Sequence, residues 1–373
     1  MSSDTESELA TGLAAHCAGD AAAAVAAYTL VLALAPGHLG AILLHMNALQ
    51  EQGDWPGAFA QFQRIARSEV AGSVDDVLQL VRLFLAQGRP DLARATTLLV
   101  AELFKTEVSA KWTEKIHLAQ SAHLTKAGAF APVPGREVLV VCPGFIDGPQ
   151  KHALVTYWTA SLQRFNPGVD WLLVDDGSAA AEWGALHFSQ AVKKSRLLQD
   201  APHAVALEGR FNAVSFPSNI GHPMSGRGKD GPGRSISTGV LSAIAAGYRS
   251  VVVLELDVFT RLDLLQVTAD MRAAGRTALS TRVAPWNFIE SGFMVFDTAH
   301  LAAIAYAQRY PWDRVCFFPQ PEWVYEAILG EVGIMPWRGG RNDFGQFAAE
   351  TVETLDFLTH CHDHALYRRY AGL

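Results

Sequence analysis

Residues 251–260 have the sequence VVVLELDVFT, an unbroken apolar run that ends in two carboxylates separated by one leucine. The run at 251–254 predicts a strand buried on both faces, as in a parallel sheet. Side chains alternate along a strand, so Glu255 and Asp257 are expected on one side of the chain, at the strand's C-terminal end. Open α/β sheets bind ligands at that end. A cation would compensate the two charges, and Mg²⁺ or Mn²⁺ carrying a diphosphate is the natural candidate, whereas a solvated strand end is the alternative for an isolated Glu-x-Asp.

Composition limits the class of protein. The chain has 373 residues, half of them apolar, which is enough for about two globular domains. A formal charge of −7 without a basic block argues against nucleic acid as a partner. The four cysteines are scattered and form no Cys-x-x-Cys pair, which fits a reducing compartment, and we predict a cytoplasmic protein. The apolar run at 21–35 is too short to span a membrane and predicts a buried helix, so no transmembrane segment is expected.

The first third of the chain repeats. Gly19-Asp20 is followed by Gly53-Asp54 and then by Gly88, each between segments with helical apolar spacing. Small residues and aromatic residues recur at matching places around these turns, as two closely packed helices require; they are Gly12, Ala24, Ala58, Ala93, Tyr28 and Phe62. This pattern resembles the tetratricopeptide repeat, with about three copies over residues 5–107 and a capping helix over 108–126. The resemblance implies an all-α domain over residues 1–128 whose surface binds a protein partner.

A cluster of glycine and proline residues at 128–135 marks a domain boundary, after which strands and helices alternate. We expect a strand at 137–142, a helix at 152–165, a strand at 171–174 and a helical stretch at 179–198. A further short strand at 211–217 and a helix at 235–247 lead to the strand at 251–254. Strand and helix in this rhythm predict a mostly parallel sheet with right-handed crossovers.

A specific resemblance appears at residues 172–178, LLVDDGS. Together with the first strand and Pro143, this segment is similar to the nucleotide-binding half of GT-A glycosyltransferases, whose family 2 members commonly carry Val-Asp-Asp-Gly-Ser at the second strand. Asp175 or Asp176 would then accept a hydrogen bond from the uracil or guanine base, and Gly177 lets the backbone turn beneath them. On its own, Asp-Asp-Gly-Ser is also a common turn.

The order of the later segments extends the resemblance over residues 136–373. Glu255-Leu256-Asp257 occupies the place of the family's Asp-x-Asp motif, with Glu instead of Asp at the first position. The basic loop before the helix at 235–247 contains Arg227, Lys229 and Arg234, which would neutralise a diphosphate with help from the helix N-terminus; a flexible surface loop is the alternative. The sequence contains no Walker-type loop and no Gly-x-Gly-x-x-Gly motif after a strand, so it does not support a kinase or a dehydrogenase.

Two candidate bases and two candidate metal ligands lie further along the chain. Glu290, in Glu-Ser-Gly, has the place of the family's acceptor-side turn and would accept the proton of the acceptor hydroxyl, with Glu322 as the rival. Several GT-A families add a late histidine to the metal, and His360 or His362 fits that place after a strand at 355–358. A plain acidic surface and a surface histidine cluster are the respective alternatives.

The sequence therefore predicts an α/β GT-A domain, mostly parallel, preceded by the tetratricopeptide-like helical domain. The resemblance implies transfer of a sugar from a UDP- or GDP-sugar to a glycan or protein acceptor, with Mn²⁺ or Mg²⁺ held by Asp257 and Glu255. Inversion or retention at the sugar is left open. The alternatives are an inactive adaptor whose repeats bind a protein partner, and a nucleotidyltransferase, although the glycine-rich turn expected of the latter is absent after the first strand.

Overall fold

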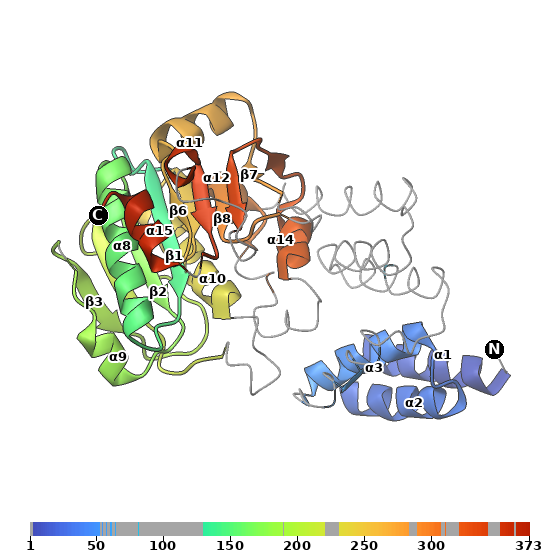
Figure 1. Ribbon diagram of the computed structural model, residues 1–373. Coiled ribbons are helices and arrows are strands. Elements are labelled where there is room, and N and C mark those ends of the chain that lie inside the picture. The colour runs from blue at the N-terminus through green and yellow to red at the C-terminus, as the bar shows by residue number, and fades with distance from the viewer. Residues whose placement is uncertain are drawn as a thin grey trace. The chain divides into compact units, whose positions relative to one another are not determined.

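A computed structural model describes the fold at residues 3–52, 130–188, 190–220, 231–282, 289–306, 321–341, 351–361 and 363–373, with single positions 54, 57, 60, 61, 64, 81 and 310. The chain divides into two compact units (Figure 1). Among the described residues, one unit contains the N-terminal helices and residues 321–327, and the other contains the sheet. The domain limits expected at 128 and 136 remain a prediction.

Three helices form the described part of the N-terminal segment: α1 (Ser3–Cys17), α2 (Ala21–Leu34) and α3 (Leu39–Glu51). Asp20 caps α2 by accepting a hydrogen bond from the Ala23 N–H. Gly12 lies directly against Tyr28, since a Cβ at position 12 would be 2.5 Å from the ring. The small and aromatic residues thus meet where α1 packs on α2, while the later repeat copies and the helix at 108–126 lie outside the described residues. No described helix is long and apolar enough to cross a membrane.

The second unit is built on a mixed sheet, which has eight strands within the described residues, in the order β3-β4-β2-β1-β5-β8-β7-β9. The first five strands in this order are parallel, β8 is antiparallel to both of its neighbours, and β9 is parallel to β7. The strands are β1 (Val138–Gly144), β2 (Asp170–Asp175), β3 (Lys193–Arg196), β4 (Phe211–Ser215), β5 (Ser250–Leu254), β7 (Ala278–Ser280), β8 (Phe293–Asp297) and β9 (Gly333–Ile334). A large, mostly parallel α/β sheet is therefore confirmed.

Helices cover both faces of the sheet. They are α8 (Pro149–Phe165), α9 (Ala180–Ala185), α10 (Gly231–Ala246), α11 (Leu264–Ala273), α12 (Thr298–Ala303) and α15 (His364–Ala371), with a 3₁₀ turn at Val352–Thr354. Most of a further helix, α14 (Pro321–Leu329), belongs to the other compact unit. Val140 and Cys142 of β1 join the core formed with α8 and α15, whereas Val141 faces α10. Alternate side chains of a strand point to opposite faces of the sheet, so the side chains on both faces of β1 must be apolar. Accordingly, β1 and β5 are buried along almost their whole length.

The crossovers change direction beside β1. The connection through α8 places β2 on one side of β1, and the connection through α10 places β5 on the other. The carboxyl ends of β1 and β5 therefore flank the switch point of the sheet, which is where open α/β folds leave room for a ligand. The Glu255–Asp257 segment begins at that edge.

A small second sheet lies at the same edge. It has the order β10-β11-β6 and contains β10 (Gly339–Arg341), β11 (Phe357–Thr359) and β6 (Phe259–Thr260). Because β11 pairs antiparallel with β6, the end of the chain returns to the turn that carries Asp257. The helix α15 then packs beside α8 (Figure 1).

The helical stretch predicted at 179–198 is wrong for most of its length. A short helix, α9, ends at Ala185, and β3 pairs with β4 at the edge of the sheet. Lys194 donates hydrogen bonds to the carbonyls of Trp183 and Leu186, which fastens the end of α9 to the strand. All four β3 residues are exposed, as suits a charged edge strand, so no apolar alternation reveals the strand.

We predict that Gly239→Ala destabilises the fold because a methyl group at this place would lie 2.3 Å from Cγ1 of Val141 on β1. Overpacking at such a contact costs about 1–3 kcal/mol, more than the ~0.5–1 kcal/mol that alanine gains over glycine inside a helix. Gly184→Ala in α9 is the matched control, since nothing lies within 4 Å of its added methyl group. Urea unfolding followed by circular dichroism measures both. Equal stability of the two variants would contradict close packing of α10 on β1.

Candidate functional site

The turn after β5 presents two carboxylates. Leu256 is buried, while Glu255 and Asp257 on either side of it are partly exposed. The Val258 N–H donates to the Glu255 carbonyl, closing the turn, and the Glu255 N–H donates to the Gly292 carbonyl at 3.0 Å, fixing the turn to the start of β8. Leu256 thus anchors the segment in the core and leaves both acidic groups on the outer side.

His360 joins these carboxylates from the far end of the sequence. Its Nδ1 lies 3.3 Å from Oδ2 of Asp257, and the ligand atoms of Glu255, Asp257 and His360 all lie within 4.8 Å of one another. Ligands of one six-coordinate ion at about 2.1 Å are about 3 Å apart when adjacent and about 4.2 Å when opposite. A bound of 4.8 Å is slightly wider than this, so small side-chain movements would let the three groups hold a single divalent cation. His362, the other predicted histidine, lies outside the described residues.

The donor set also indicates which cation suits the cluster. Carboxylate oxygens suit Mg²⁺ and Mn²⁺, while an imidazole favours a transition metal, so the mixed set fits Mn²⁺ better than Mg²⁺. Burial and then the charges of Glu255 and Asp257 raise the pKa of the Cys142 thiol on β1. Cys142 is not among the side chains whose ligand atoms gather at the cluster.

The backbone at His360 is unusual. Its φ is +46°, in the left-handed region that residues other than glycine rarely adopt. Such a conformation costs about 1–3 kcal/mol and persists only where the surrounding structure holds it. Here it turns the imidazole toward Asp257.

Glu290 lies beside the same cluster. It is 1% exposed, and its Oε1 accepts a hydrogen bond from the Gly292 N–H at 3.1 Å. A Cβ at position 292 would be 3.2 Å from this oxygen and 3.3 Å from Oε2 of Glu255, so the two carboxylates flank the glycine. The predicted base and a predicted metal ligand are therefore neighbours. Glu322, the rival base, lies in α14 and is buried; it belongs to the other compact unit.

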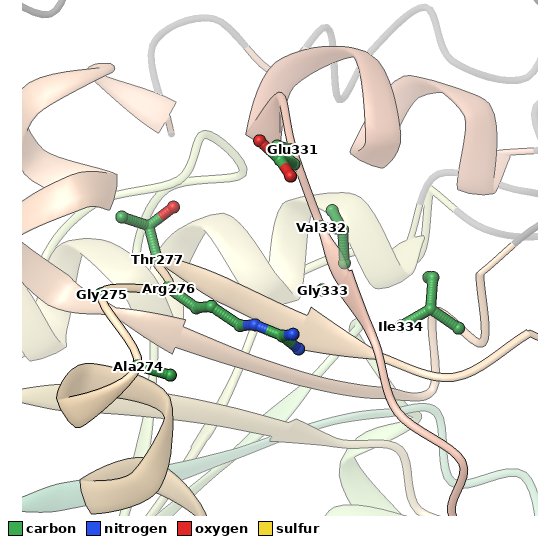
Figure 2. A pocket seen from close by; sticks show the side chains of 8 residues that line it. All are labelled: Ala274, Gly275, Arg276, Thr277, Glu331, Val332, Gly333 and Ile334. Atoms are coloured by element: carbon green, nitrogen blue, oxygen red, sulfur yellow. The ribbon is translucent and has the colours of Figure 1, made fainter.

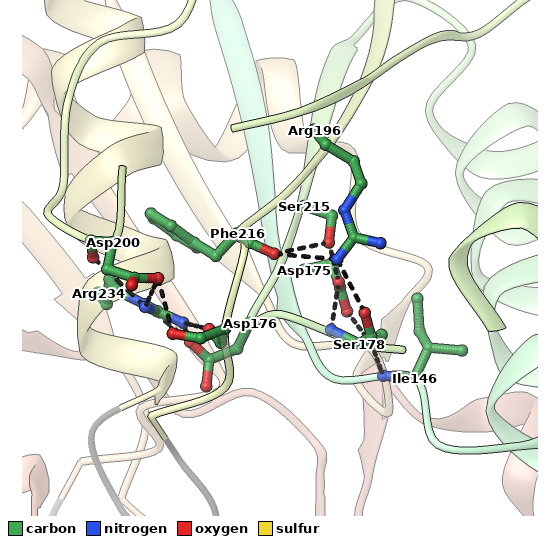
Figure 3. Close-up of polar contacts among 10 residues, drawn as sticks. Ile146, Asp175, Asp176, Ser178, Arg196, Asp200, Ser215, Phe216 and Arg234 are labelled. Carbon is green, nitrogen blue, oxygen red and sulfur yellow. Dashed lines mark hydrogen bonds and ion pairs between the residues drawn. The ribbon is translucent and has the colours of Figure 1, made fainter. Parts of the chain in front are cut away.

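Asp175 holds the ends of three segments together (Figure 3). Its carboxylate is fully buried and accepts hydrogen bonds from the Ser178 N–H at 2.8 Å, the Ser215 hydroxyl at 2.6 Å and the Ser178 hydroxyl. The Ser178 Oγ in turn accepts from the Ile146 N–H at 2.7 Å, which ties in the loop after β1. Burial raises the pKa of Asp175, although these hydrogen bonds oppose the rise. Its described contacts are structural.

Asp176 pairs with Arg234 of α10 (Figure 3). Arg234 is fully buried and donates through Nε at 2.9 Å, and also through Nη2, to Oδ1 of Asp176. It further donates to the Ser218 carbonyl at 2.7 Å and lies over the Phe216 ring at 3.9 Å. The guanidinium is thus engaged inside the protein and is poorly placed to neutralise a diphosphate. Arg227 and Lys229, the other two predicted cations, lie outside the described residues.

Base reading by Asp175 or Asp176 remains a prediction, since both carboxylates are buried in the contacts above. Pro143 lies within β1, paired with Val174 of β2, and its contact with a nucleotide likewise remains a prediction. Two features had no counterpart among the sequence predictions: the Asp176–Arg234 pair and the place of Gly292 between two carboxylates. The Asp176–Arg234 pair joins residues that are far apart in the chain, so no local pattern indicates it. For Gly292, the sequence offers one signal, a glycine directly before a buried strand.

A pocket of about 490 Å³ lies at the opposite end of the sheet, between the loop before β7 and the loop before β9 (Figure 2). Arg276 and Glu331 are its charged lining residues. Thr277, one of its lining residues, accepts a hydrogen bond from the Asp297 N–H at the C-terminal end of β8, whereas Gly292 directly precedes the other end of that strand. The pocket therefore takes no part in the carboxylate and histidine cluster.

Comparison with known proteins gives fold similarity only. No protein-family model matches the sequence, and none of the curated proteins is similar to it. Among solved structures, the galactosyltransferase LgtC, in complex with donor and acceptor sugar analogues, aligns over 63% of this chain and 95% of its own at 11% identity and a TM-score of 0.37. The glycosyltransferase GlyE of Streptococcus pneumoniae aligns over 64% and 60% at 9% identity and a TM-score of 0.38. Similarity at this level assigns no activity to the chain.

We predict that Asp175→Ala lowers the free energy of unfolding by about 3 kcal/mol or more, because it leaves several buried donors without their acceptor. Asp200→Ala is the control: Asp200 is the half-exposed outer partner of Arg234, and its removal should cost less than about 1 kcal/mol. Chemical denaturation measures both. A small loss in Asp175→Ala would show that the network is not required for the fold.

We also predict an inverted order of stability at position 360. Glycine adopts a φ of +46° freely and alanine does not, so His360→Gly should be more stable than His360→Ala by about 1 kcal/mol. At Ala269, an exposed position in α11, the ordinary order should hold, and Ala269→Gly should lose about 0.5–1 kcal/mol. Thermal and urea unfolding of the three variants checks this. If alanine is the more stable residue at position 360, the left-handed conformation is not maintained in solution.

Proposed function

We propose that this protein is a metal-dependent glycosyltransferase that moves a sugar from a nucleotide diphosphate donor, a UDP- or GDP-sugar, to a hydroxyl of a glycan or protein acceptor. The observation that carries the proposal is the cluster of Glu255, Asp257 and His360 at the carboxyl end of β5, beside the switch point of the sheet. A divalent cation would balance the charge of the two carboxylates and, through its remaining coordination positions, would bind the oxygens of a diphosphate.

Asp257, Glu255 and His360 would hold the cation, which when bound offsets the negative charge that develops on the leaving diphosphate. Asp257 has the central place because it contacts His360 directly. Glu255 is fixed through its backbone to Gly292, so its side chain approaches the metal from a rigid support. These residues orient the donor through the metal rather than react with the sugar themselves.

The N-terminus of α10 lies at the same edge of the sheet, because α10 precedes β5 and its Arg234 reaches Asp176 just beyond β2. The macrodipole of this 16-residue helix places a partial positive charge at this end, which would attract an anion. The diphosphate would lie between this terminus and the metal, with Lys229 as a further cation. The base would lie near Pro143 and the Asp175-Asp176 turn.

Glu290 would accept the proton of the acceptor hydroxyl if the reaction inverts the sugar. Its carboxylate lies beside that of Glu255 across Gly292, next to the proposed metal centre, which is where a general base would meet the acceptor hydroxyl. Retention at the sugar would need no such base. The N-terminal helices would bind the acceptor or a protein partner.

The experiment that tests the proposal is a thermal-shift panel of nucleotide sugars, each with and without Mn²⁺. A ligand at a hundred times its dissociation constant stabilises the folded state by about 2.7 kcal/mol, which a melting curve detects. We expect one UDP- or GDP-sugar to stabilise the protein, and only when Mn²⁺ is present. Stabilisation by no member of the panel would contradict a glycosyltransferase.

We predict that Asp257→Asn abolishes transfer and Mn²⁺-dependent nucleotide binding while leaving the fold intact, since an amide is isosteric and the side chain is partly exposed. Glu255→Gln should have a smaller effect. Asp270→Asn on the exposed face of α11 is the control and should behave like the wild type. Turnover and nucleotide titrations with Mn²⁺ compare the three variants. Unchanged turnover in Asp257→Asn would remove the proposed metal centre.

A further inference from the structure

The two halves of the cluster come from distant parts of the chain. Glu255 and Asp257 lie on the turn after β5, and His360 lies on the segment between β11 and α15. A metal centre needs its ligands held within a few tenths of an ångström, which two independent loops do not provide. Some group must therefore set the distance between the two segments.

Tyr367 of α15 contacts both of them. Its hydroxyl donates to the Asp257 carbonyl at 2.6 Å and accepts from the Cys361 N–H at 2.8 Å. Cys361 directly follows His360, so the second bond fixes the peptide that carries the left-handed histidine. One oxygen atom thus joins the backbone of Asp257 to the backbone of the His360 segment.

The Tyr367 side chain is itself held rigidly. It is fully buried, and its ring lies 4.5 Å from that of Phe259, centroid to centroid, on the strand that follows the Asp257 turn. Asp363 directly precedes α15 and caps it by accepting a hydrogen bond from the Ala365 N–H. Arg261 donates to the Tyr370 carbonyl and Arg164 to the Gly372 carbonyl, which fastens the end of the helix. The hydroxyl therefore has little freedom to move.

We infer that Tyr367 is a positioning residue of the metal centre: its hydroxyl sets the separation of His360 and Asp257, and thereby the affinity for a divalent cation. The inference rests on the proposed function, because it concerns the same cluster. Tyr367 need not touch the metal, the donor or the acceptor; it acts through the backbone of its two partners. Outer groups of this kind commonly change metal affinity by about 10- to 100-fold when they are removed.

The test is a calorimetric titration of Mn²⁺ into the wild type, Tyr367→Phe and Tyr370→Phe. Each substitution removes one buried hydroxyl from the same helix; that of Tyr370 donates to the carbonyls of Leu355 and Asp356, away from the cluster. We expect Tyr367→Phe to bind Mn²⁺ about tenfold more weakly and Tyr370→Phe to bind like the wild type. Urea unfolding of both variants, expected to show similar losses, separates the effect on the metal from a general loss of stability.

A double-mutant cycle with His360→Ala tests whether Tyr367 affects Mn²⁺ affinity through His360. If Tyr367 acts by placing His360, Tyr367→Phe should have little further effect on Mn²⁺ affinity once the imidazole is gone. An equal effect with and without His360 would overturn the inference, as would wild-type affinity in Tyr367→Phe. A wild-type protein that binds no Mn²⁺ would instead overturn the metal centre itself, and the inference with it.

Discussion

Burial of strands β1, β2 and β5 on both faces is the constraint on which the rest of the structure depends. Inside such a strand an ionised side chain has neither water nor room for a partner, so charge can appear only where the strand ends. Asp175 is the last residue of β2 and Asp176 follows it, and Glu255-Leu256-Asp257 follows β5, for this reason. Parallel strands end at a common edge, so apolar strands of similar length bring their terminal carboxylates to the same place.

The acidic groups at this edge are stabilised in two different ways. Asp175 and Asp176 lie in the interior, where hydroxyls, an N–H and a fully buried arginine satisfy them. A buried pair of this kind adds little net stability, but loss of one partner is expensive, so the pair ties α10 to the end of β2. Glu255 and Asp257 remain partly exposed, and the imidazole of His360 lies beside Asp257. Such a site leaves a place for a cation.

The sequence predicted the features that depend on neighbouring residues. The run before Glu255 predicted β5, and similar runs predicted β1 and β2, because burial on both faces requires continuous apolar sequence. It did not reveal β3, whose residues are all exposed and which exists because β4 offers a free edge. It also left His360 and His362 equivalent. The left-handed backbone and the contact with Asp257 single out His360 among the described residues, and both arise from tertiary structure.

The two halves of the cluster differ in how they are held. The Glu255–Asp257 turn belongs to the sheet through the bond from the Glu255 N–H to the Gly292 carbonyl, whereas His360 lies on a terminal segment docked through β11 and α15. A cation bound by both halves would link the docked segment to the sheet. Because a ligand that binds only the folded state stabilises it by mass action, metal binding would strengthen the attachment of the end of the chain. The conformational cost at His360 is then partly offset by the ligand that it helps to hold.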